Sequence, residues 1–509
     1  MKKRIAFLLA AAMLVTTMAS CSQSGNESTP SSTDSGSSSQ EEKKEVVDIK
    51  YCVPGNKPAD YDLVMEEVNK QLAEDINARL EIEYIPYDAW DQKINMKLTT
   101  GESFDLLQIM QTHTKLIANN ALTDITEILD KSAPDYKKVV PQNVLDAAKV
   151  DGKLYIMPTY WYEPTAECGL LIRKDLRDQY NFENPKDPYE ALDQLETVMK
   201  DWEGDYKPYI IIDGKNISPT GGPRSSVLHV SYDSYPFIVK NELGIIYEDM
   251  TMKPWIESEE FKKDAEFYHS AYERGLLVPD VLTIQPTQKS AHLTSGEWYL
   301  DFGGGSFSAK GFENPDDMFE FITFAKEGTK LMRPMTIKDT IGVPYTSENP
   351  ETAVKFINWL YADQENYNLF LYGIEGKHYT NIDDRHHTLI LNEETGTSDW
   401  SFADWMIGNL NFIKVDPTSV LKCVEEARYV PDEDALIHPA DAFVFDATSV
   451  QAELANVQSA VQTYIVPIYV GVVSYEDEFE NAMKELRAAG YDKVMAEFEK
   501  QYQEFCKNL

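Results

Sequence analysis

Residues that build metal centres are scarce in this sequence. Among 509 residues there are five cysteines and eight histidines, with no CxxC pair and no histidine at zinc-ligand spacing. His386 and His387 follow Asp383 and Asp384, but adjacent residues of a regular element point apart, so a solvated loop is the simpler interpretation. We therefore expect neither a metal ion nor another cofactor.

The sequence also gives little support to disulfide bonds. The cysteines that follow Cys21 are widely scattered along the chain: Cys52, Cys168, Cys423 and Cys506. Two disulfides between them are arithmetically possible, but buried free thiols are the plainer interpretation. The sequence does not determine a connectivity.

Basic side chains are outnumbered by acidic ones. The chain has 47 Lys and Arg against 85 Asp and Glu, which gives a formal net charge of −38 at pH 7. Such a charge repels phosphate polymers, so no nucleic-acid partner is expected. A cationic ligand would suit an acidic surface, but a solvated and soluble surface is the simpler interpretation.

Common catalytic signatures are missing as well. The sequence contains no HExxH, no P-loop and no GxSxG, so metalloprotease, nucleotide hydrolase and α/β-hydrolase activities receive no support. Asp399 with Asp404, or Asp213 with Asp233, could form a glycosidase dyad. With 85 acidic residues, however, such pairs arise by chance almost everywhere.

Long apolar runs are limited to the N-terminus. Lys2, Lys3 and Arg4 form a positive segment, and Ile5–Val15 is an apolar run of signal-peptide length rather than spanning length. Residues 1–20 are therefore predicted to be an export signal. Beyond them the sequence has no apolar run long enough to span a bilayer.

The end of this signal resembles a bacterial lipobox. Met18, Ala19 and Ser20 precede Cys21, although Met18 stands where leucine is usual. The resemblance implies that Cys21 is diacylated, with palmitate as a lipid, and becomes the new N-terminus. An ordinary secretory cleavage site with an incidental cysteine is the alternative.

A polar tether follows the predicted anchor. Ser22–Gln40 is rich in Ser, Thr and Gly and cannot bury enough apolar surface to fold, so residues 21–45 are predicted to be a disordered linker. A chain of this kind reaches on the order of 25–30 Å on average. It would hold a folded body on the extracellular face of the cell membrane.

The first part of the body predicts an α/β fold. Strands and helices alternate over Val47–Val53, Tyr61–Leu80, Leu80–Ile85, Ala89–Glu102 and Phe104–Met110. This order predicts a parallel, doubly wound sheet covered on both faces. Ligands of such sheets bind beyond the carboxyl ends of the strands, which here are Gly55–Asp60, Tyr87–Asp91 and Gln111–Thr114.

The rest of the chain predicts a second α/β region and a helical tail. Short strands at Leu154–Met157 and Gly169–Ile172 flank an aromatic, proline-rich crossover. The clearest later elements are strands at Pro208–Gly214 and Glu297–Gly305, a helix that is capped by Asn349 and begins at Pro350, and an amphipathic tail over Ser449–Leu509 that breaks near Pro467 and Gly490. A chain of this length should fold into more than one lobe. We expect lobe 1 to comprise 46–158 and about 326–380, and lobe 2 to comprise 159–325 and about 381–509.

Aromatic residues are the most informative candidates for binding. Eight Trp and 29 Tyr are present, and several lie in predicted loops or at a helix start: Trp90, Tyr160, Trp161, Tyr162, Tyr232 and Tyr235. A sugar ring has an apolar C–H face and a fringe of hydroxyls, so its site needs flat rings and polar groups. Other tryptophans are assigned to packing: Trp202, Trp255 and Trp359.

Several segments resemble one known family. The relevant stretches are DGKLYIMP at 151–158, NPETAVKFINWLY at 349–361, GIEGKHYT at 373–380 and ELRAAGYDKVMAEFEKQYQEF at 485–505. They look like the extracellular solute-binding lipoproteins of bacterial ABC importers, in particular the type 1 sugar-binding group of Gram-positive bacteria with a C-terminal region of formerly unknown function. The resemblance implies a two-lobed periplasmic-binding-protein-like fold that is monomeric and non-catalytic, closes on a carbohydrate and delivers it to an ABC permease.

The same resemblance nominates contact residues. The candidates that it adds or supports are Lys57, Trp90, Gln111 and His113 in the first lobe, Trp161 and Glu163 in the crossover, and Gly304, Ser306, Phe307, Trp405 and Asn409 later in the chain. Phe307 stands where the family often has tryptophan. Trp161 is the contact we expect most, with Tyr160 or Tyr162 as the alternative.

Two other functions remain open at the level of the sequence. One is a surface-anchored glycoside hydrolase, and the other is a peptide-binding importer component, because aromatic clefts also suit peptides. A binding protein leaves an oligosaccharide intact and melts at a higher temperature when the oligosaccharide is bound, whereas a hydrolase forms products.

Overall fold

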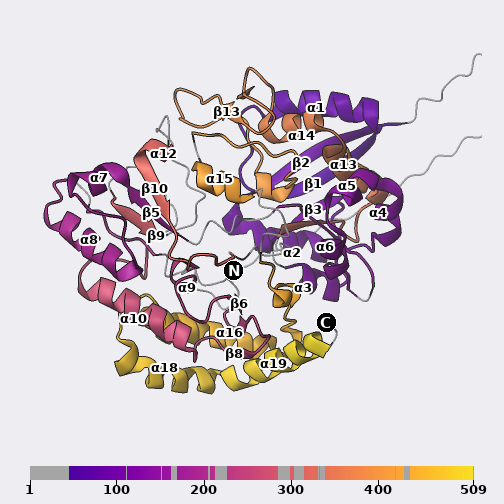
Figure 1. The fold of residues 1–509 in the computed structure, drawn as a ribbon. Helices are drawn as coiled ribbons and strands as arrows, with labels where there is room; N and C mark the ends of the chain where they lie inside the picture. Colours follow the sequence, from indigo (N-terminus) through magenta and orange to yellow (C-terminus); the bar gives the residue numbers. More distant parts are fainter. Residues whose placement is uncertain are drawn as a thin grey trace, which may run out of the picture. The chain divides into compact units, whose positions relative to one another are not determined.

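The computed structural model describes most of residues 45–507 as one compact unit (Figure 1). The described part omits residues 111, 151, 162–168, 205–206, 213–225, 285–297, 303–314, 331, 333–338, 419 and 429–435, and neither 1–44 nor 508–509 is described. The predicted signal, the lipidation site Cys21 and the tether therefore lie outside the described residues.

The first lobe is built on a five-stranded sheet. Its strands are β1 (Val47–Pro54), β2 (Ala78–Ile85), β3 (Leu106–Met110), β4 (Ile156–Pro158) and β11 (Asp339–Gly342), in the order β2-β1-β3-β11-β4. β1 is parallel to β2 and β3, as expected, but β11 runs antiparallel to both β3 and β4. The sheet is therefore mixed rather than wholly parallel, since a short strand from a distant part of the chain is inserted into it.

Helices cover both faces of this sheet (Figure 1). They are α1 (Tyr61–Asp75), α2 (Trp90–Thr100), α3 (His113–Ala118), α4 (Thr126–Ser132), α5 (Pro134–Val139), α6 (Gln142–Ala147), α13 (Pro350–Ala362) and α14 (Gln364–Tyr372). Helix α1 ends five residues before the predicted Leu80, because Asn77 adopts a left-handed φ of 55° and turns the chain into β2. Leu80 instead lies opposite Ile49 in the sheet.

Helix α13 begins at Pro350, as predicted. Asn349 occupies the N-cap position, as predicted, but its side chain makes no capping hydrogen bond. Its amide Nδ2 donates to the carbonyl of Asp48 at 3.3 Å, while its backbone N–H donates to Asp105 Oδ1 at 3.2 Å. The asparagine therefore joins α13 to the start of β1.

The first core extends further along the chain than expected. Buried residues from the segment after α14 belong to it: Tyr379, Trp400, Phe402, Met406, Ile407, Leu410 and Ile413. The segment includes the hairpin of β12 (Tyr379–Asn381) and β13 (His387–Leu389). The first lobe therefore reaches Ile413, beyond the predicted boundary near residue 380.

The second lobe holds two small antiparallel sheets. One has the order β10-β5-β9, with β5 (Leu170–Arg173), β9 (Leu300–Phe302) and β10 (Phe319–Ile322); the other is the meander β6 (Phe237–Lys240), β7 (Gly244–Tyr247) and β8 (Met252–Pro254). The associated helices are α7 (Lys174–Gln179), α8 (Pro188–Lys200), α9 (Ser226–His229), α10 (Glu259–Glu273), α12 (Pro315–Met318) and α15 (Lys422–Arg428). The strand predicted at Pro208–Gly214 is reduced, in its described residues, to one bridge from Ile210 to Leu277.

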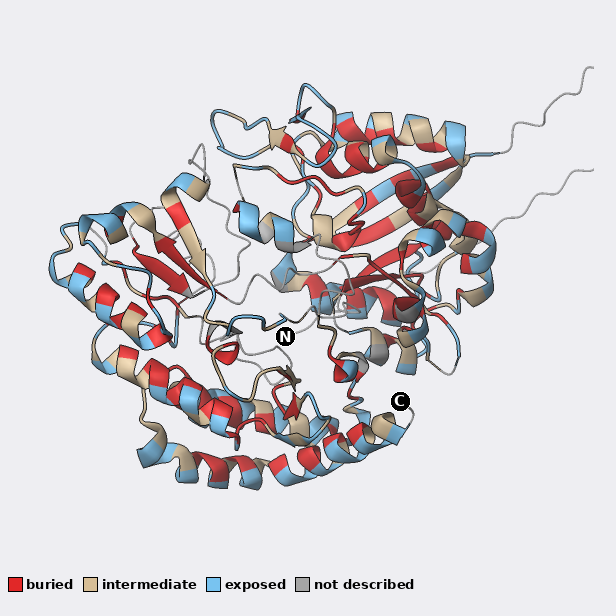
Figure 2. Ribbon diagram, in the orientation of Figure 1, coloured by how far each residue is buried: buried red, intermediate tan, exposed pale blue. Residues whose placement is uncertain are grey.

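The C-terminal region is helical, as predicted. It comprises α16 (Gln451–Ala460), a π-helical turn (Val461–Ile465), α17 (Val466–Tyr469), α18 (Tyr475–Ala489) and α19 (Tyr491–Lys507). Gly490 (φ 107°) ends α18, and Gly471 (φ 80°) follows α17. A Cβ at Gly471 would lie 2.2 Å from the backbone of Tyr268, so only glycine lets this turn pack directly on α10. Figure 2 shows buried residues along one side of α18 and α19 and exposed residues along the other.

Candidate functional site

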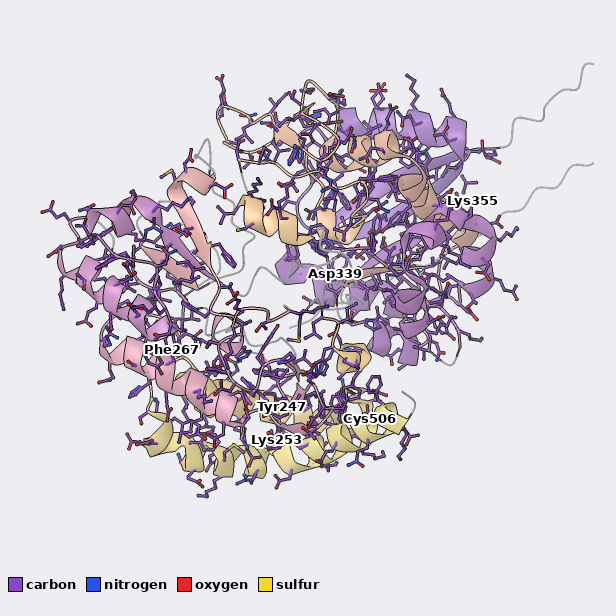
Figure 3. The ribbon with its side chains drawn as sticks, viewed as in Figure 1. Tyr247, Lys253, Phe267, Asp339, Lys355 and Cys506 are labelled. Atoms are coloured by element: carbon purple, nitrogen blue, oxygen red, sulfur yellow. The ribbon has the colours of Figure 1, made fainter. Side chains whose placement is uncertain are left out.

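The carboxyl edge of the first sheet gathers the predicted binding loops. β1, β2 and β3 end there, and the antiparallel register places the start of β11 and the end of β4 at the same edge, since Asp339 lies opposite Met110 and Thr340 opposite Pro158. Asp339 is labelled in Figure 3. Loops of an α/β sheet bind ligands at this edge.

Two chain segments run side by side from this edge. The N–H of Tyr160 donates to the carbonyl of Gly408 at 2.8 Å, and the N–H of Leu410 donates to the carbonyl of Tyr160 at 3.1 Å. A Cβ on Gly408 would lie 2.5 Å from the Cβ of Trp161, so the absence of a side chain permits this approach. We call 158–161 and 407–410 the paired segments.

Buried tyrosines of the first lobe fix the paired segments in place. The hydroxyl of Tyr361 donates to the carbonyl of Gly408 at 2.5 Å, and that of Tyr367 donates to the carbonyl of Ile407 at 3.3 Å. The hydroxyl of Tyr136 likewise donates to the carbonyl of Pro158 at 2.5 Å. Burial raises the pKa of all three hydroxyls, so they stay neutral donors at physiological pH.

A pocket of about 690 Å³ lies between α3 of the first lobe and α16 of the second. The first lobe contributes Met110, Thr112, Lys115, Ala118 and Asn119. The second contributes Asn241, Leu243, Phe445, Asp446, Ala447, Thr448, Gln451, Leu454, Ala455 and Gln458. This volume is within the range of about 300–1,000 Å³ that is typical of small-molecule sites. We call it the inter-lobe pocket.

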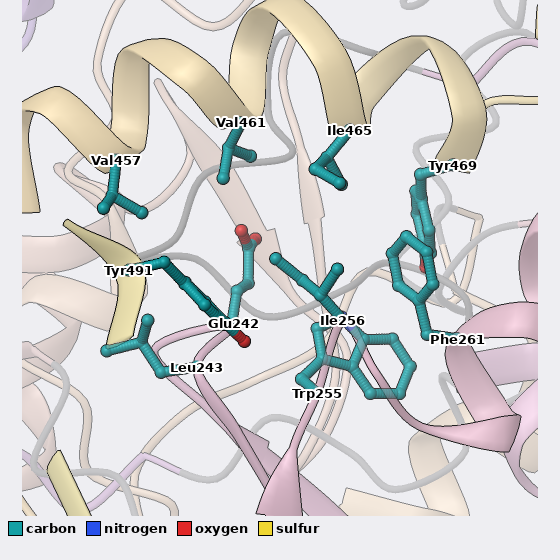
Figure 4. Close-up of a pocket in the computed structure, with 10 residues that line it drawn as sticks. All are labelled: Glu242, Leu243, Trp255, Ile256, Phe261, Val457, Val461, Ile465, Tyr469 and Tyr491. Carbon is teal, nitrogen blue, oxygen red and sulfur yellow. The ribbon is translucent and has the colours of Figure 1, made fainter. Parts of the chain in front are cut away.

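A second cavity has a different character. It lies inside the second lobe and is lined mainly by apolar side chains, together with Glu242, Tyr469 and Tyr491 (Figure 4). The space inside is about 20 Å³, enough for about one water molecule. It is too small for a sugar ring, so the inter-lobe pocket is the better candidate.

The predicted contact residues of the first lobe lie in different environments. Lys57 is exposed in the loop after β1, with its Nζ 3.0 Å from Asp62 Oδ1 and 4.2 Å from the ring centroid of Tyr61. Trp90, a ring that was nominated for the solute, is 5 % exposed and belongs to the hydrophobic core of the first lobe. His113 opens α3 beside the pocket residue Thr112, and burial lowers its pKa to about 4. It is therefore neutral at physiological pH.

Trp161, Trp405 and Asn409 lie at the paired segments. Trp161 is 7 % exposed and belongs to the first core, against which Tyr160 also packs. Trp405 is half-buried, and its backbone N–H donates to Asp404 Oδ1 at 2.8 Å. Asn409 is fully buried, and its Oδ1 accepts from the N–H of Asn411 at 3.1 Å. Solute contact at these positions stays a prediction.

Tyr232 and Tyr235 belong to the second lobe and are half-buried. The hydroxyl of Tyr232 donates to Asp264, which also lies 2.9 Å from His229 Nε2 and accepts from the hydroxyl of Tyr469 at 3.1 Å. The hydroxyl of Tyr235 accepts from the N–H of Met332 at 3.0 Å. Both tyrosines are thus tied into the second lobe, and neither belongs to the inter-lobe pocket.

Five predicted contacts, and the alternative contact Tyr162, lie outside the described residues. The five contacts are Gln111, Glu163, Gly304, Ser306 and Phe307. Gln111 nevertheless lies in the chain between two pocket residues, Met110 and Thr112.

The sequence did not indicate the face of α16 that lines the pocket. The pocket is lined from one face of the helix by residues at helical spacing: Gln451, Leu454, Ala455 and Gln458. The neighbouring Val457 is buried in the hydrophobic core of the second lobe. The tail was recognised as an amphipathic helix, and its half-polar stripe was the signal that could have revealed this face. Lys115 and Asn119, on or just after α3, gave no signal, because one turn of a short helix has no distinctive pattern.

The structure gives no support to a metal centre or a glycosidase dyad among the described residues. No group of three His, Cys, Asp or Glu side chains in that part of the chain could hold a metal ion. Asp399 is hydrogen-bonded to Asn392, and Asp404 to the N–H of Trp405. Cys52 is a buried free thiol, as predicted, and burial raises its pKa to about 12. Cys506 is half-buried and Cys423 is exposed, so the prediction of burial was wrong for Cys423.

The histidine pair departs from the solvated loop that we expected. His386 Nδ1 lies 2.9 Å from Asp383 Oδ1 and its Nε2 lies 2.9 Å from Glu425 Oε1, and the bond to Asp383 is the main cause that raises its pKa. His387 is only 5 % exposed and packs 4.2 Å from the ring of Tyr372, so the expectation was wrong for this residue. Burial lowers the pKa of His387 to about 4.

The described helices include none that is both long and apolar enough to cross a membrane.

Comparison with known families gives two matches. Residues 56–367 match the family described as bacterial extracellular solute-binding protein. Residues 439–507 match a domain of unknown function, DUF3502, which covers the helical C-terminal region.

Two relatives align with most of the chain. A carbohydrate ABC transporter substrate-binding protein of Streptococcus pneumoniae is 24% identical over 477 residues, which cover 90% of this chain and 91% of the relative. The polygalacturonan/rhamnogalacturonan-binding protein YtcQ of Bacillus subtilis is 21% identical over 457 residues, 86% of this chain and 88% of the relative.

Solved structures confirm the two-lobed architecture. The N-glycan transport solute binding protein NgtS of Streptococcus pneumoniae, in complex with Man1GlcNAc, superposes with a TM-score of 0.67 at 19% identity, covering 90% of this chain and 99% of NgtS. A solute-binding protein of Bifidobacterium longum infantis, described as HMO binding, gives a TM-score of 0.63 at 18% identity, with 90% and 98% coverage.

Proposed function

The chain belongs to the family of bacterial extracellular solute-binding proteins, and from this premise we propose that it captures an oligosaccharide in the inter-lobe pocket and delivers it to an ABC permease. The two-lobed fold suits this role, because a solute held between lobes can be enclosed by their closure and released by their opening.

The observation that carries the proposal is the composition of the inter-lobe pocket. Asn119 of the first lobe and Gln458 of the second each contribute a side-chain amide, and Thr112 contributes a hydroxyl. Amides and hydroxyls both donate and accept hydrogen bonds, as sugar hydroxyls require. Leu243 and Phe445 add apolar surface for the C–H face of a sugar ring.

The relatives support a carbohydrate rather than a peptide. The names of the full-length relative from Streptococcus pneumoniae, YtcQ and NgtS refer to a carbohydrate, to polygalacturonan and rhamnogalacturonan, and to N-glycan.

A binding role fits the described pocket better than hydrolysis. Glycoside hydrolysis uses a pair of carboxylic acids that flank the scissile bond. Among the described residues that line the pocket, Asp446 is the single acid, and its Oδ1 already accepts from the N–H of Thr448 at 2.9 Å. We therefore infer a non-catalytic protein.

The proposal includes an anchor and a partner. Export by residues 1–20 and lipidation at Cys21 would hold the protein on the extracellular face of the cell membrane, with residues 22–45 as a tether. The permease subunits of an ABC importer are the proposed protein partner. The chain is proposed to act as a monomer.

A titration with an oligosaccharide panel tests the proposal. We expect one sugar class to bind in calorimetry, to raise the melting temperature and to be recovered intact. Asn119→Ala and Gln458→Ala should each weaken binding by about tenfold through the loss of a hydrogen bond to the sugar. Asn456→Ala, on the same helix but outside the pocket lining, is the matched control and should bind like the wild type. Sugar cleavage, or a peptide ligand, would refute the proposed function.

A further inference from the structure

The charge of the inter-lobe pocket indicates the class of sugar that it can hold. Of its described lining residues, only Lys115 and Asp446 are charged, one from each lobe, so their formal charges cancel. We propose that the ligand is an uncharged oligosaccharide rather than a polymer of uronic acids or a sialylated glycan. This inference rests on the proposed function and deepens it.

A uronic acid oligomer carries a carboxylate on every sugar unit, and each buried carboxylate needs a cation or several hydrogen-bond donors. Lys115 is the single cation that the described lining offers. Asp446 faces the same space and would repel such a ligand.

The second-lobe lysine that is next to a pocket residue in the sequence is already engaged. Lys240, which precedes the pocket residue Asn241, places its Nζ 2.9 Å from Asp441 Oδ1 and also donates to the carbonyl of Asp441. Recruiting this cation for an anionic ligand would break existing interactions.

The electrostatic field of the whole chain also disfavours an anionic ligand. A formal charge of −38 lowers the local concentration of anions and slows their association. An uncharged sugar meets no such barrier, and the amides and hydroxyls of the pocket satisfy its hydroxyls without an ionic contact.

The test compares two ligand classes on the purified protein. Neutral manno-, galacto-, fructo- and chito-oligosaccharides are titrated calorimetrically beside oligogalacturonates, alginate oligomers and sialylated oligosaccharides. Each ligand that binds is titrated again between ~50 and ~500 mM NaCl, because screening weakens an ionic contact and leaves a neutral one unchanged. Lys115→Gln is measured with Lys138→Gln as the matched control, since Lys138 is an exposed lysine paired with Asp135 outside the pocket.

We expect a neutral oligosaccharide to bind with an affinity that changes less than about twofold across this salt range and in the control variant Lys138→Gln. An acidic oligosaccharide that binds more tightly, weakens with salt and loses about tenfold in Lys115→Gln would overturn the inference and leave the proposed function standing. Binding of neither class would overturn the proposed function itself, and the inference with it.

Discussion

At the scale of single residues, the site depends on side chains whose roles the sequence indicated only in part. Trp161 was predicted from three consecutive aromatics, which cannot all face one core from an extended chain. The structure places this ring in the first core at 7 % exposure, directly against Gly408. The sequence could not predict this contact, because Gly408 lies far along the chain.

Trp161→Ala separates the two possible roles of this ring. Loss of a buried tryptophan should lower the free energy of unfolding by about 3–5 kcal/mol. If the ring also stacks on the sugar, the affinity should fall by about one to two orders of magnitude. Trp359→Ala is the control, since Trp359 is 4 % exposed in the same core and should lose stability alone. Wild-type affinity in a destabilised Trp161→Ala protein would show that Trp161 is structural.

His387 should make the stability of the protein depend on pH. Burial lowers its folded pKa to about 4, below the usual value of 6.5, so the unfolded chain binds more protons between these values. Its contribution is complete above about pH 6.5 and is lost as the pH falls toward 4, by up to about 1.4 kcal/mol per pH unit.

The neighbouring His386 opposes this effect, because Asp383 raises its pKa. Because His387→Phe lacks the titrating imidazole, urea unfolding at pH 7 and pH 5 should show a smaller loss of stability in this variant than in the wild type. An equal loss in both proteins would show that His387 does not titrate as proposed.

At the scale of elements, alternation along the chain predicted most of the first sheet. Strands β1, β2 and β3 follow period-two or continuous apolar patterns, and their helices repeat every three to four residues. Strand β11 could not be found in this way, since its four residues carry no alternation and pair with strands more than 180 residues earlier. Pairing of that kind is decided by tertiary contacts rather than by local preference.

Tyr361 joins the paired segments to helix α13, and Tyr361→Phe tests this role. Its hydroxyl donates to the carbonyl of Gly408 and accepts from the N–H of Tyr160 at 3.4 Å. Loss of these buried bonds should lower the free energy of unfolding by about 1–2 kcal/mol. Tyr345→Phe is the control, because Tyr345 is 51 % exposed and donates to the carbonyl of Leu98. Equal small losses in both variants would argue against an anchoring role.

At the scale of the whole molecule, the proposed function combines a predicted anchor and tether with a two-lobed body. Composition and charge predicted a soluble body without a nucleic-acid partner, and the family resemblance predicted the two lobes. The inter-lobe pocket was beyond prediction, since α3 and α16 meet only through the tertiary fold and their pocket residues are more than 300 positions apart.

The anchor gives a prediction that is independent of the pocket. Cys21→Ala removes the acceptor of the lipid, so the protein should move from the membrane fraction to the soluble fraction. Its affinity for the sugar should be unchanged, because a flexible tether isolates the anchor from the fold. Membrane fractionation and calorimetry on the same preparation measure both effects. Unchanged membrane partition would refute lipidation at Cys21.

The most direct test of the central claim is a calorimetric titration of the wild type and of the double variant Asn119→Ala/Gln458→Ala with the tightest-binding oligosaccharide. We predict that one sugar binds per molecule of the wild type. The affinity of the double variant should be about a hundredfold lower, because one amide is removed from each lobe. Without ligand, the two proteins should have equal melting temperatures. Equal affinity in the two proteins would contradict the central claim, since the sugar would then be held outside the inter-lobe pocket.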